Sequence, residues 1–205
     1  KKIVYLWLFL AVSTLATAQK KIQSPAEFLG YELGTKFTFH HRVIDYYEYV
    51  AQQAPERVKL IPYGTSFEGR PLLVAFVANE SNLSQLEDIR TNNLKSIGLL
   101  EGKPTSKVPA IAWMSYNIHG NESVSTEAVL QVLYELAARE DCAAQHIRAN
   151  SVVVVLPIQN PDGRAAGTRR NAFGFDLNRD WFARTQPETD GKLELMRQYP
   201  PQLFI

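Results

Sequence analysis

Two apolar runs on either side of an amphipathic segment constrain the fold of this chain more than any other feature. Residues 107–118 are mostly apolar and residues 151–161 are rich in valine, so both runs are typical of buried strands. Between them, residues 123–140 repeat apolar side chains every three or four positions, which predicts a helix. A strand, a helix and a second strand in this order indicate an α/β fold in which the two strands share one sheet.

Other segments extend this pattern on both sides. Residues 40–53 have apolar side chains at helical spacing, and residues 57–64 and 71–78 look like two strands joined by a polar turn. Residues 188–199 predict one more helix, and the final residues, PPQLFI, resemble the beginning of a further strand. We therefore predict an α/β fold with a mixed, mainly parallel sheet, a hairpin at one edge and helices on both faces, incomplete at the C-terminus.

The N-terminal segment has the features of an export signal. Residues 1–18 begin with two lysines, continue with an apolar core over residues 3–12 and end with small residues at 16–18. The core is too short to favour a membrane span, so we expect cleavage, a secreted or periplasmic protein, and no stable membrane span afterwards. Residues 19–39 are punctuated by Pro and Gly and are expected to be irregular, which leaves residues 40–205 for the folded domain.

The composition narrows the classes of partner. The chain has 205 residues, of which 45% are hydrophobic, so one domain can bury a sizeable core. Its 22 Lys and Arg residues and 21 Asp and Glu residues give a formal net charge of +1. This balance provides no basic excess for binding nucleic acid, and we expect no nucleic acid partner.

The stretch SYNIHGNESVST, residues 115–126, contains a candidate metal site. His119 and Glu122 lie three positions apart, at the carboxyl end of the strand predicted for residues 107–118. In open α/β sheets, ligands bind beyond the carboxyl ends of the strands, and Gly120 would allow the backbone to turn sharply between the two side chains. The alternative is a polar turn in which Glu122 stabilises the N-terminus of the following helix.

A second polar region follows the strand predicted for residues 151–161. Residues 160–181 read NPDGRAAGTRRNAFGFDLNRDW and interleave asparagines with four arginines: Arg164, Arg169, Arg170 and Arg179. Guanidinium and amide groups together bind carboxylates through planar hydrogen bonds, so this loop is a candidate anion-binding floor beside the metal pair. A solvated surface is the alternative, and Asp162 and Asp176 are expected to shape the loop.

Three motifs in this order, H-x-x-E, N-P-D-G and R-x-N-x-x-G-x-D-L-N-R, resemble the zinc carboxypeptidase family. The resemblance implies that family's α/β fold and one catalytic zinc ion, with His119 and Glu122 as its first two protein ligands. A catalytic zinc of this type takes three protein ligands and a water molecule. The third ligand, a His, and the general base, a Glu, have no match in this chain, and the resemblance implies that both lie beyond Ile205.

The same resemblance assigns roles in substrate binding. Asn178 and Arg179 match the pair that grips the terminal carboxylate of a peptide substrate. Arg169 matches the arginine that polarises the scissile carbonyl and stabilises the oxyanion, and the neighbouring Arg170 is the competing choice. The remaining histidines match no ligand position and are expected to be ordinary helix or surface residues: His40, His41 and His146.

These inferences together predict a zinc metallocarboxypeptidase. It would hydrolyse C-terminal residues from peptides with a free C-terminal carboxylate, through a metal-activated water molecule. Residues 40–205 would be the N-terminal part of its catalytic domain, and this chain alone would be inactive. Two alternatives stay open: a zinc-dependent enzyme that removes acyl groups from N-acyl amino acids, and a non-catalytic relative that binds peptides or cell wall.

Overall fold

A five-stranded sheet forms the centre of the molecule. A computed structural model describes residues 21–105 and 108–205, so the predicted signal peptide, residues 1–18, lies outside the described residues. The strands lie in the order β1-β2-β4-β3-β5, with the valine-rich strand β4 in the middle. Their bounds are β1 Val58–Thr65, β2 Pro71–Val77, β3 Ala110–Ser115, β4 Ser151–Leu156 and β5 Leu203–Phe204.

The sheet is mixed, which confirms the predicted fold class. Strands β1 and β2 form the predicted antiparallel hairpin, and β2 also pairs antiparallel with β4. Strand β3 runs parallel to β4, with Ala110 opposite Ser151 and Ser115 opposite Leu156. The final strand, β5, continues the parallel half of the sheet next to β3. The parallel half therefore carries the carboxyl ends at which the candidate site was expected.

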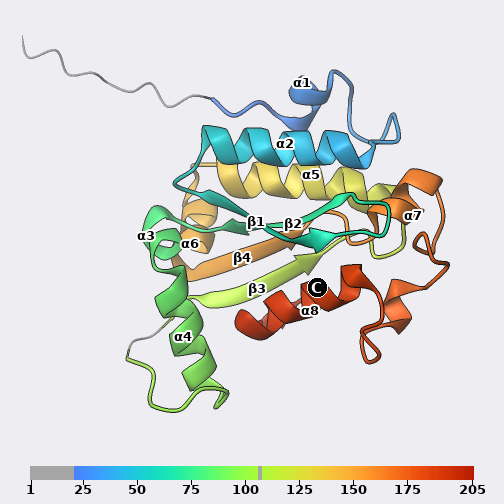
Figure 1. Cartoon of the computed structure of the whole chain (residues 1–205). Helices are drawn as coiled ribbons and strands as arrows, with labels where there is room; N and C mark the ends of the chain where they lie inside the picture. The colour runs from blue at the N-terminus through green and yellow to red at the C-terminus, as the bar shows by residue number, and fades with distance from the viewer. Residues whose placement is uncertain (1–20, 106–107) are drawn as a thin grey trace, which may run out of the picture.

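Helices cover both faces of this sheet (Figure 1). Their bounds are α1 Pro25–Leu29, α2 His40–Gln53, α3 Glu80–Ser84, α4 Leu86–Ser96, α5 Ser123–Ala138, α6 Cys142–Asn150, α7 Pro161–Ala166 and α8 Pro187–Gln198, with a 3₁₀ turn, η1, at Leu177–Arg179. The long helices α2, α5 and α8 lie where the sequence predicts them. No helix within the described ranges is long and apolar enough to cross a membrane.

Two hydrophobic cores lie on opposite faces of the sheet, because successive side chains of a strand point to opposite sides. In β4, Val153 and Val155 pack with α2 and α5, whereas Val152 and Val154 pack with α4 and α8. All four side chains are buried. Burial on both faces explains why this strand is apolar at every position instead of at every second one.

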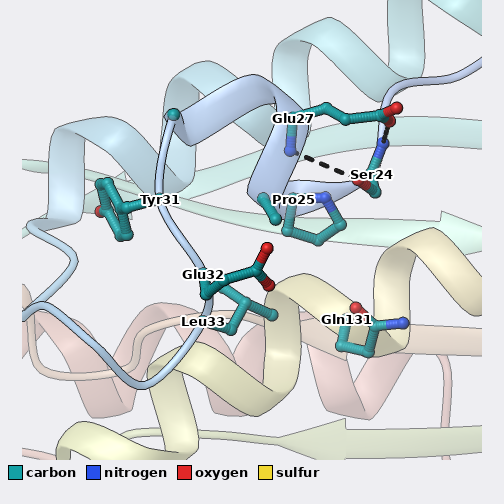
Figure 2. A pocket seen from close by; sticks show the side chains of 9 residues that line it. Ser24, Pro25, Glu27, Tyr31, Glu32, Leu33 and Gln131 are labelled. Atoms are coloured by element: carbon teal, nitrogen blue, oxygen red, sulfur yellow. Dashed lines mark hydrogen bonds between the residues drawn. The ribbon is translucent and has the colours of Figure 1, made fainter.

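Three short helices depart from the sequence analysis, which treated their residues as irregular or left them unassigned. Helix α1 lies within the segment 19–39 and begins with a capping box, in which Ser24 and Glu27 each accept a hydrogen bond from the other's backbone N–H (Figure 2). Helices α6 and α7 are preceded by the N-cap residues Asp141 and Asn160, whose side chains accept hydrogen bonds from backbone N–H groups of the first turn. Local capping, not apolar periodicity, starts these helices.

Candidate functional site

The two loops expected to form the site lie side by side at the carboxyl ends of β3 and β4. The backbone N–H of Gln159 donates to the Tyr116 carbonyl over 3.2 Å, and that of Asn160 donates to the Asn117 carbonyl over 3.1 Å. The ladder between the parallel strands thus continues beyond their ends. The position predicted for these two loops is therefore confirmed.

Gly120 serves a second purpose besides the turn that the sequence predicted. It does not adopt a left-handed conformation; the residue of this turn with positive φ is Asn117, at 54°. A Cβ atom on Gly120 would lie 1.9 Å from the carbonyl carbon of Gly163 and 2.2 Å from the backbone nitrogen of Arg164. The backbone does turn at Gly120, since the Glu122 N–H donates to the His119 carbonyl over 3.1 Å, but a glycine is needed there because the backbone of α7 passes directly against it.

His119 and Glu122 face each other at the end of β3. The Nδ1 atom of His119 lies 2.7 Å from Oε1 of Glu122, and its Nε2 atom lies 3.2 Å from Oδ1 of Asp176. The imidazole is buried, whereas the Glu122 side chain is 43% exposed. Glu122 occupies the N-cap position of α5 without a capping hydrogen bond from its side chain, so among the described residues its partner is His119, and any stabilisation of the helix comes from its charge alone.

This pair fits two of the ligands that a zinc ion takes. Zinc binds imidazole nitrogen and carboxylate oxygen at about 2.0–2.2 Å, so the two atoms would need to separate only slightly to share one ion. A proton on Nε2 of His119, directed at Asp176, leaves the lone pair of Nδ1 directed at Glu122. Among the described residues, no set of three His, Cys, Asp or Glu side chains is arranged to hold a metal ion.

Asp176 links the metal pair to the arginine-rich loop. Its Oδ2 atom accepts a hydrogen bond from Nε of Arg169 over 3.0 Å, and its Oδ1 atom accepts one from the backbone N–H of Asn178 over 2.9 Å. Partial burial alone would raise the pKa of Asp176, but the Asn178 N–H and the Arg169 guanidinium hold it below its usual value. The sequence predicts only a loop-shaping role for Asp176, and its contact with His119 emerges from the fold.

The predicted substrate-binding residues surround Asp176. Asn178 and Arg179 form the turn η1 directly after it, and Arg179 donates from Nη1 to the Asn178 carbonyl over 2.9 Å. Arg179 lines an open pocket together with Arg170, Phe175 and Thr185. Arg170 donates from Nη1 to the Gly174 carbonyl over 2.7 Å and does not contact Asp176, so Arg169 lies closer to the metal pair than its neighbour does.

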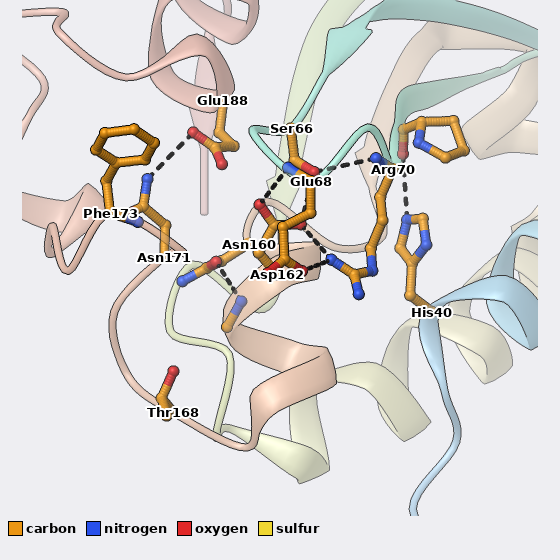
Figure 3. A network of polar contacts seen from close by, with 12 residues as sticks. His40, Ser66, Glu68, Arg70, Asn160, Asp162, Thr168, Asn171, Phe173 and Glu188 are labelled. Carbon is orange, nitrogen blue, oxygen red and sulfur yellow. Dashed lines mark hydrogen bonds and ion pairs between the residues drawn. The ribbon is translucent and has the colours of Figure 1, made fainter.

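Buried polar side chains bond this loop to neighbouring elements (Figure 3). Asp162, which is almost fully buried, accepts hydrogen bonds from Ser66 Oγ and Arg70 Nη1, both over 2.6 Å, and from the Glu68 backbone N–H over 3.2 Å. These three donors lie in the turn of the β1–β2 hairpin. Asp162 therefore fixes the start of the arginine-rich loop to the hairpin, in agreement with the loop-shaping role expected for it.

Asn171 organises the middle of the same loop. Its Oδ1 atom accepts hydrogen bonds from the backbone N–H groups of Phe173 and Phe175, over 3.2 and 2.9 Å. Its Nδ2 atom donates to Gln186 Oε1 over 2.8 Å and reaches Glu188 Oε2 at 3.4 Å. Burial raises the pKa of Glu188 above its usual value. The turn that precedes Asp176 is thus anchored on the N-terminus of α8.

Comparison with known proteins places this arrangement in a family. The family model for zinc carboxypeptidases matches residues 43–200. This chain belongs to the zinc carboxypeptidase family. The match covers both loops of the site, the hairpin and helix α8, and it agrees with the resemblance carried by the three sequence motifs.

The most similar curated relatives include carboxypeptidases from fungi and animals. Carboxypeptidase 2 of Trichophyton tonsurans is 33% identical over 101 residues, which covers 49% of this chain and 18% of the relative. Carboxypeptidase D of Homo sapiens is 27% identical over 212 residues, covering 93% of this chain and 14% of that protein. The chain therefore spans less than a fifth of the length of either relative.

Solved structures show the same fold. Carboxypeptidase A from Helicoverpa armigera superimposes with a TM-score of 0.67 at 18% identity, covering 92% of this chain and 49% of that one. A metallo-carboxypeptidase from Burkholderia cenocepacia gives a TM-score of 0.62 at 21% identity, covering 80% of this chain and 39% of that one. The zinc carboxypeptidases thus share this chain's mixed sheet and the helices that cover it.

Proposed function

We propose that this chain is the N-terminal part of a zinc metallocarboxypeptidase that removes C-terminal residues from peptides. The observation that carries the proposal is the position of His119 between Glu122 and Asp176, with one imidazole nitrogen directed at each carboxylate. His119 and Glu122 would hold one zinc ion. Family membership supports the metal, and the remaining His ligand and the general base Glu would come from sequence beyond these 205 residues.

In this proposal the residues of the chain orient the reacting groups. A bound zinc ion supplies a water molecule of lowered pKa and polarises the peptide carbonyl. Asp176 keeps a proton on Nε2 of His119 and so presents Nδ1 as a ligand. Arg169, which Asp176 holds in place, would donate to the carbonyl oxygen as negative charge develops on it.

Asn178 and Arg179 would bind the terminal carboxylate of the substrate. A guanidinium group binds a carboxylate through two parallel hydrogen bonds, and the open pocket beside Arg179 leaves room for one. Such a contact would restrict cleavage to the last residue of a peptide. The predicted signal peptide supports export to the periplasm or the medium, where the substrates would be peptides outside the cell.

The test uses the full-length protein and three substrates: a peptide with a free C-terminus, the same peptide with a C-terminal amide, and an N-acyl amino acid. Mass spectrometry should detect release of the last residue from the free peptide alone. A chelator should abolish this release and added zinc should restore it. Cleavage of the N-acyl amino acid alone would indicate a deacylase, and binding without hydrolysis would indicate a non-catalytic relative.

Arg179→Ala tests the carboxylate contact directly. A hydrogen bond to a charged group contributes about 1.5–3 kcal/mol, so KM for the free peptide should rise roughly 10- to 100-fold with a smaller change in kcat. Arg184→Ala is a matched control, because Arg184 pairs with Asp190 and Glu194 of α8 outside the pocket. Unchanged kinetics for Arg179→Ala would remove this residue from the substrate site.

A further inference from the structure

An open pocket lies beside the first turn of α5, directly after the candidate zinc ligand Glu122. Its walls include Ser123 and Val124 from that turn and Lys36 and Phe37 from the segment that precedes α2. Val124 is 78% exposed and Phe37 is 37% exposed, so two apolar side chains face solvent next to a polar site. Single exposed apolar residues are ordinary, but the way in which Phe37 is held is not.

A buried arginine supports the Phe37 ring from the protein side. The Arg164 guanidinium is fully buried, and its central carbon lies 3.3 Å from the centroid of the Phe37 ring. Its Nε and Nη2 atoms donate to the Thr38 carbonyl over 3.2 and 2.8 Å, while Nη1 has no hydrogen-bond partner in the structure. Burial lowers the pKa of Arg164 to about 10, which shows that placing a charge here is unfavourable.

A second buried charge fixes the same segment to α5. The Glu127 carboxylate accepts hydrogen bonds from the backbone N–H and the hydroxyl of Thr38, over 3.1 and 3.0 Å. It also lies 3.8 Å from Nη2 of Arg164. Glu127 belongs to the turn of α5 that follows Ser123 and Val124, so the position of Phe37 is fixed relative to the metal pair. A ring held in this way loses little conformational freedom when a ligand covers it.

We propose that Phe37 and Val124 form a subsite that binds an apolar or aromatic side chain of the peptide substrate, upstream of the bond that is cleaved. The inference rests on the proposed function. With the terminal carboxylate at Arg179 and the reacting carbonyl beside Glu122, the upstream part of the peptide would extend from Arg179 past Glu122 towards the turn of α5 that begins at Ser123. The pocket that directly follows Glu122 is the one lined by Val124 and Phe37, and the protein side of the Phe37 ring already carries the Arg164 cation.

The experiment compares peptide substrates that extend to the subsite with a short one that does not. One series of acetylated peptides keeps the same two C-terminal residues and places Phe, Leu or Gly in turn at each of the three positions upstream of them. A short N-acyl dipeptide, which ends before the subsite, gives the reference rate. The full-length, zinc-loaded protein should cleave the best Phe peptide about tenfold more efficiently than its Gly counterpart, judged by kcat/KM.

Variants then assign this preference to the subsite. Phe37→Ala should abolish the preference for Phe over Gly and leave kcat/KM for the dipeptide unchanged, whereas Phe37→Tyr should retain it. Phe182→Ala removes a fully exposed phenylalanine that does not line this pocket and is the matched control. Calorimetric titration of the metal-free variants with the same peptides gives the comparison without hydrolysis, and circular dichroism verifies the fold.

Two results would overturn the subsite. One is a wild-type protein that cleaves or binds Phe and Gly peptides equally well; the other is a preference that survives in Phe37→Ala. A failure of the proposed function looks different, because even the short dipeptide would then stay intact in the presence of zinc. In that case the titrations still decide whether Phe37 contributes to peptide binding.

Discussion

The centre of the sheet and the arginine-rich loop, residues 160–181, are held together by opposite means. Strand β4 is surrounded by apolar side chains on both faces, and its valines make no side-chain hydrogen bonds. The loop is instead stabilised by hydrogen bonds to buried polar side chains, chiefly those of Asp162, Asn171 and Asp180. Asp180 alone accepts hydrogen bonds from the Thr185 N–H, the Thr185 hydroxyl and the Gln186 N–H.

This difference explains how the side chains of the candidate site are positioned precisely. Apolar contacts are non-directional, so a core tolerates side chains of similar volume. Hydrogen bonds to buried carboxylates are directional, and a buried partner left unpaired is destabilising. The candidate substrate residues are therefore positioned by side chains such as Asp162 and Asn171, which themselves touch no candidate ligand or substrate group.

Among the variants considered, Asp162→Ala in the arginine-rich loop should lower the stability of the protein most. Asp162→Ala leaves Ser66 Oγ and the Glu68 N–H without their acceptor and Arg70 without a buried partner, so we expect a loss of about 3–5 kcal/mol in the free energy of unfolding. Urea denaturation of the parent protein and the variant measures this loss in the free energy of unfolding. The surface pair of Arg42 and Asp45 is the control, and Asp45→Ala should change stability by less than about 1 kcal/mol.

The corresponding test in the apolar core is Leu130, which is fully buried on α5. Leu130→Ala should lower the free energy of unfolding by about 2–4 kcal/mol, since a cavity remains. Leu130→Met should lower it by less than about 1.5 kcal/mol, because the volume is conserved. A methionine variant as unstable as the alanine variant would show that the core is as geometrically demanding as the loop.

A near-isosteric change in the loop sharpens the contrast. Asn171→Asp removes the N–H group that donates to Gln186 Oε1 and places a second carboxyl group beside Glu188. We therefore expect the free energy of unfolding to fall by about 1–3 kcal/mol despite the unchanged volume. Because burial raises the pKa of Glu188 and its carboxyl is neutral when protonated, the deficit should shrink as the pH falls through that raised pKa. Asn150→Asp, at an exposed site, is the control; an equal effect there would contradict the argument.

The smallest expected effect is a gain in stability. Lys192 is buried, with Nζ 2.8 Å from Gln159 Oε1 and 3.8 Å from the centroid of the Trp181 ring, and burial lowers its pKa to about 7. In the unfolded chain the amine keeps its proton up to about pH 10.5. The burial of this amine therefore lowers the free energy of unfolding most below pH 7, and the effect vanishes near pH 10.5. Lys192→Met should therefore add about 1–2 kcal/mol at pH 6 and progressively less towards pH 10.

Urea unfolding of the parent and the methionine variant at pH 6, 8 and 10 measures that gain. The Gln159 amide loses its donor in the variant, which limits the benefit. A stability difference that is independent of pH would show that Lys192 is not the titrating group.

The long elements of the fold were predictable from sequence because their signal accumulates over many residues. Helices α2 and α5 repeat apolar side chains over three turns or more, and β4 is valine-rich throughout. Helices α1 and α7, with five and six residues, are too short for periodicity to show. Their signals are the caps Ser24 and Asn160, each followed by a proline at the first helical position.

The residues of the candidate site also differ in whether a local sequence pattern reveals them. His119 and Glu122 are neighbours in sequence, so their spacing reveals them. Asp176 lies 57 positions from His119, and Arg164 lies 126 positions from Thr38. Such contacts depend on how the elements pack, and no local pattern encodes them. The motif D-L-N-R marks Asp176 as a loop residue, but only the fold shows that it reaches the imidazole.

The close approach of Gly120 and Gly163 has a consequence for engineering. At this point of contact backbone lies against backbone, so the separation of the two loops cannot be adjusted there by enlarging or trimming a side chain. The loops therefore behave as one interlocked unit. Transplanting the arginine-rich loop into another hydrolase, or randomising it in a library, requires that residues 117–122 travel with it, and variation is best directed at the outward-facing side chains of both.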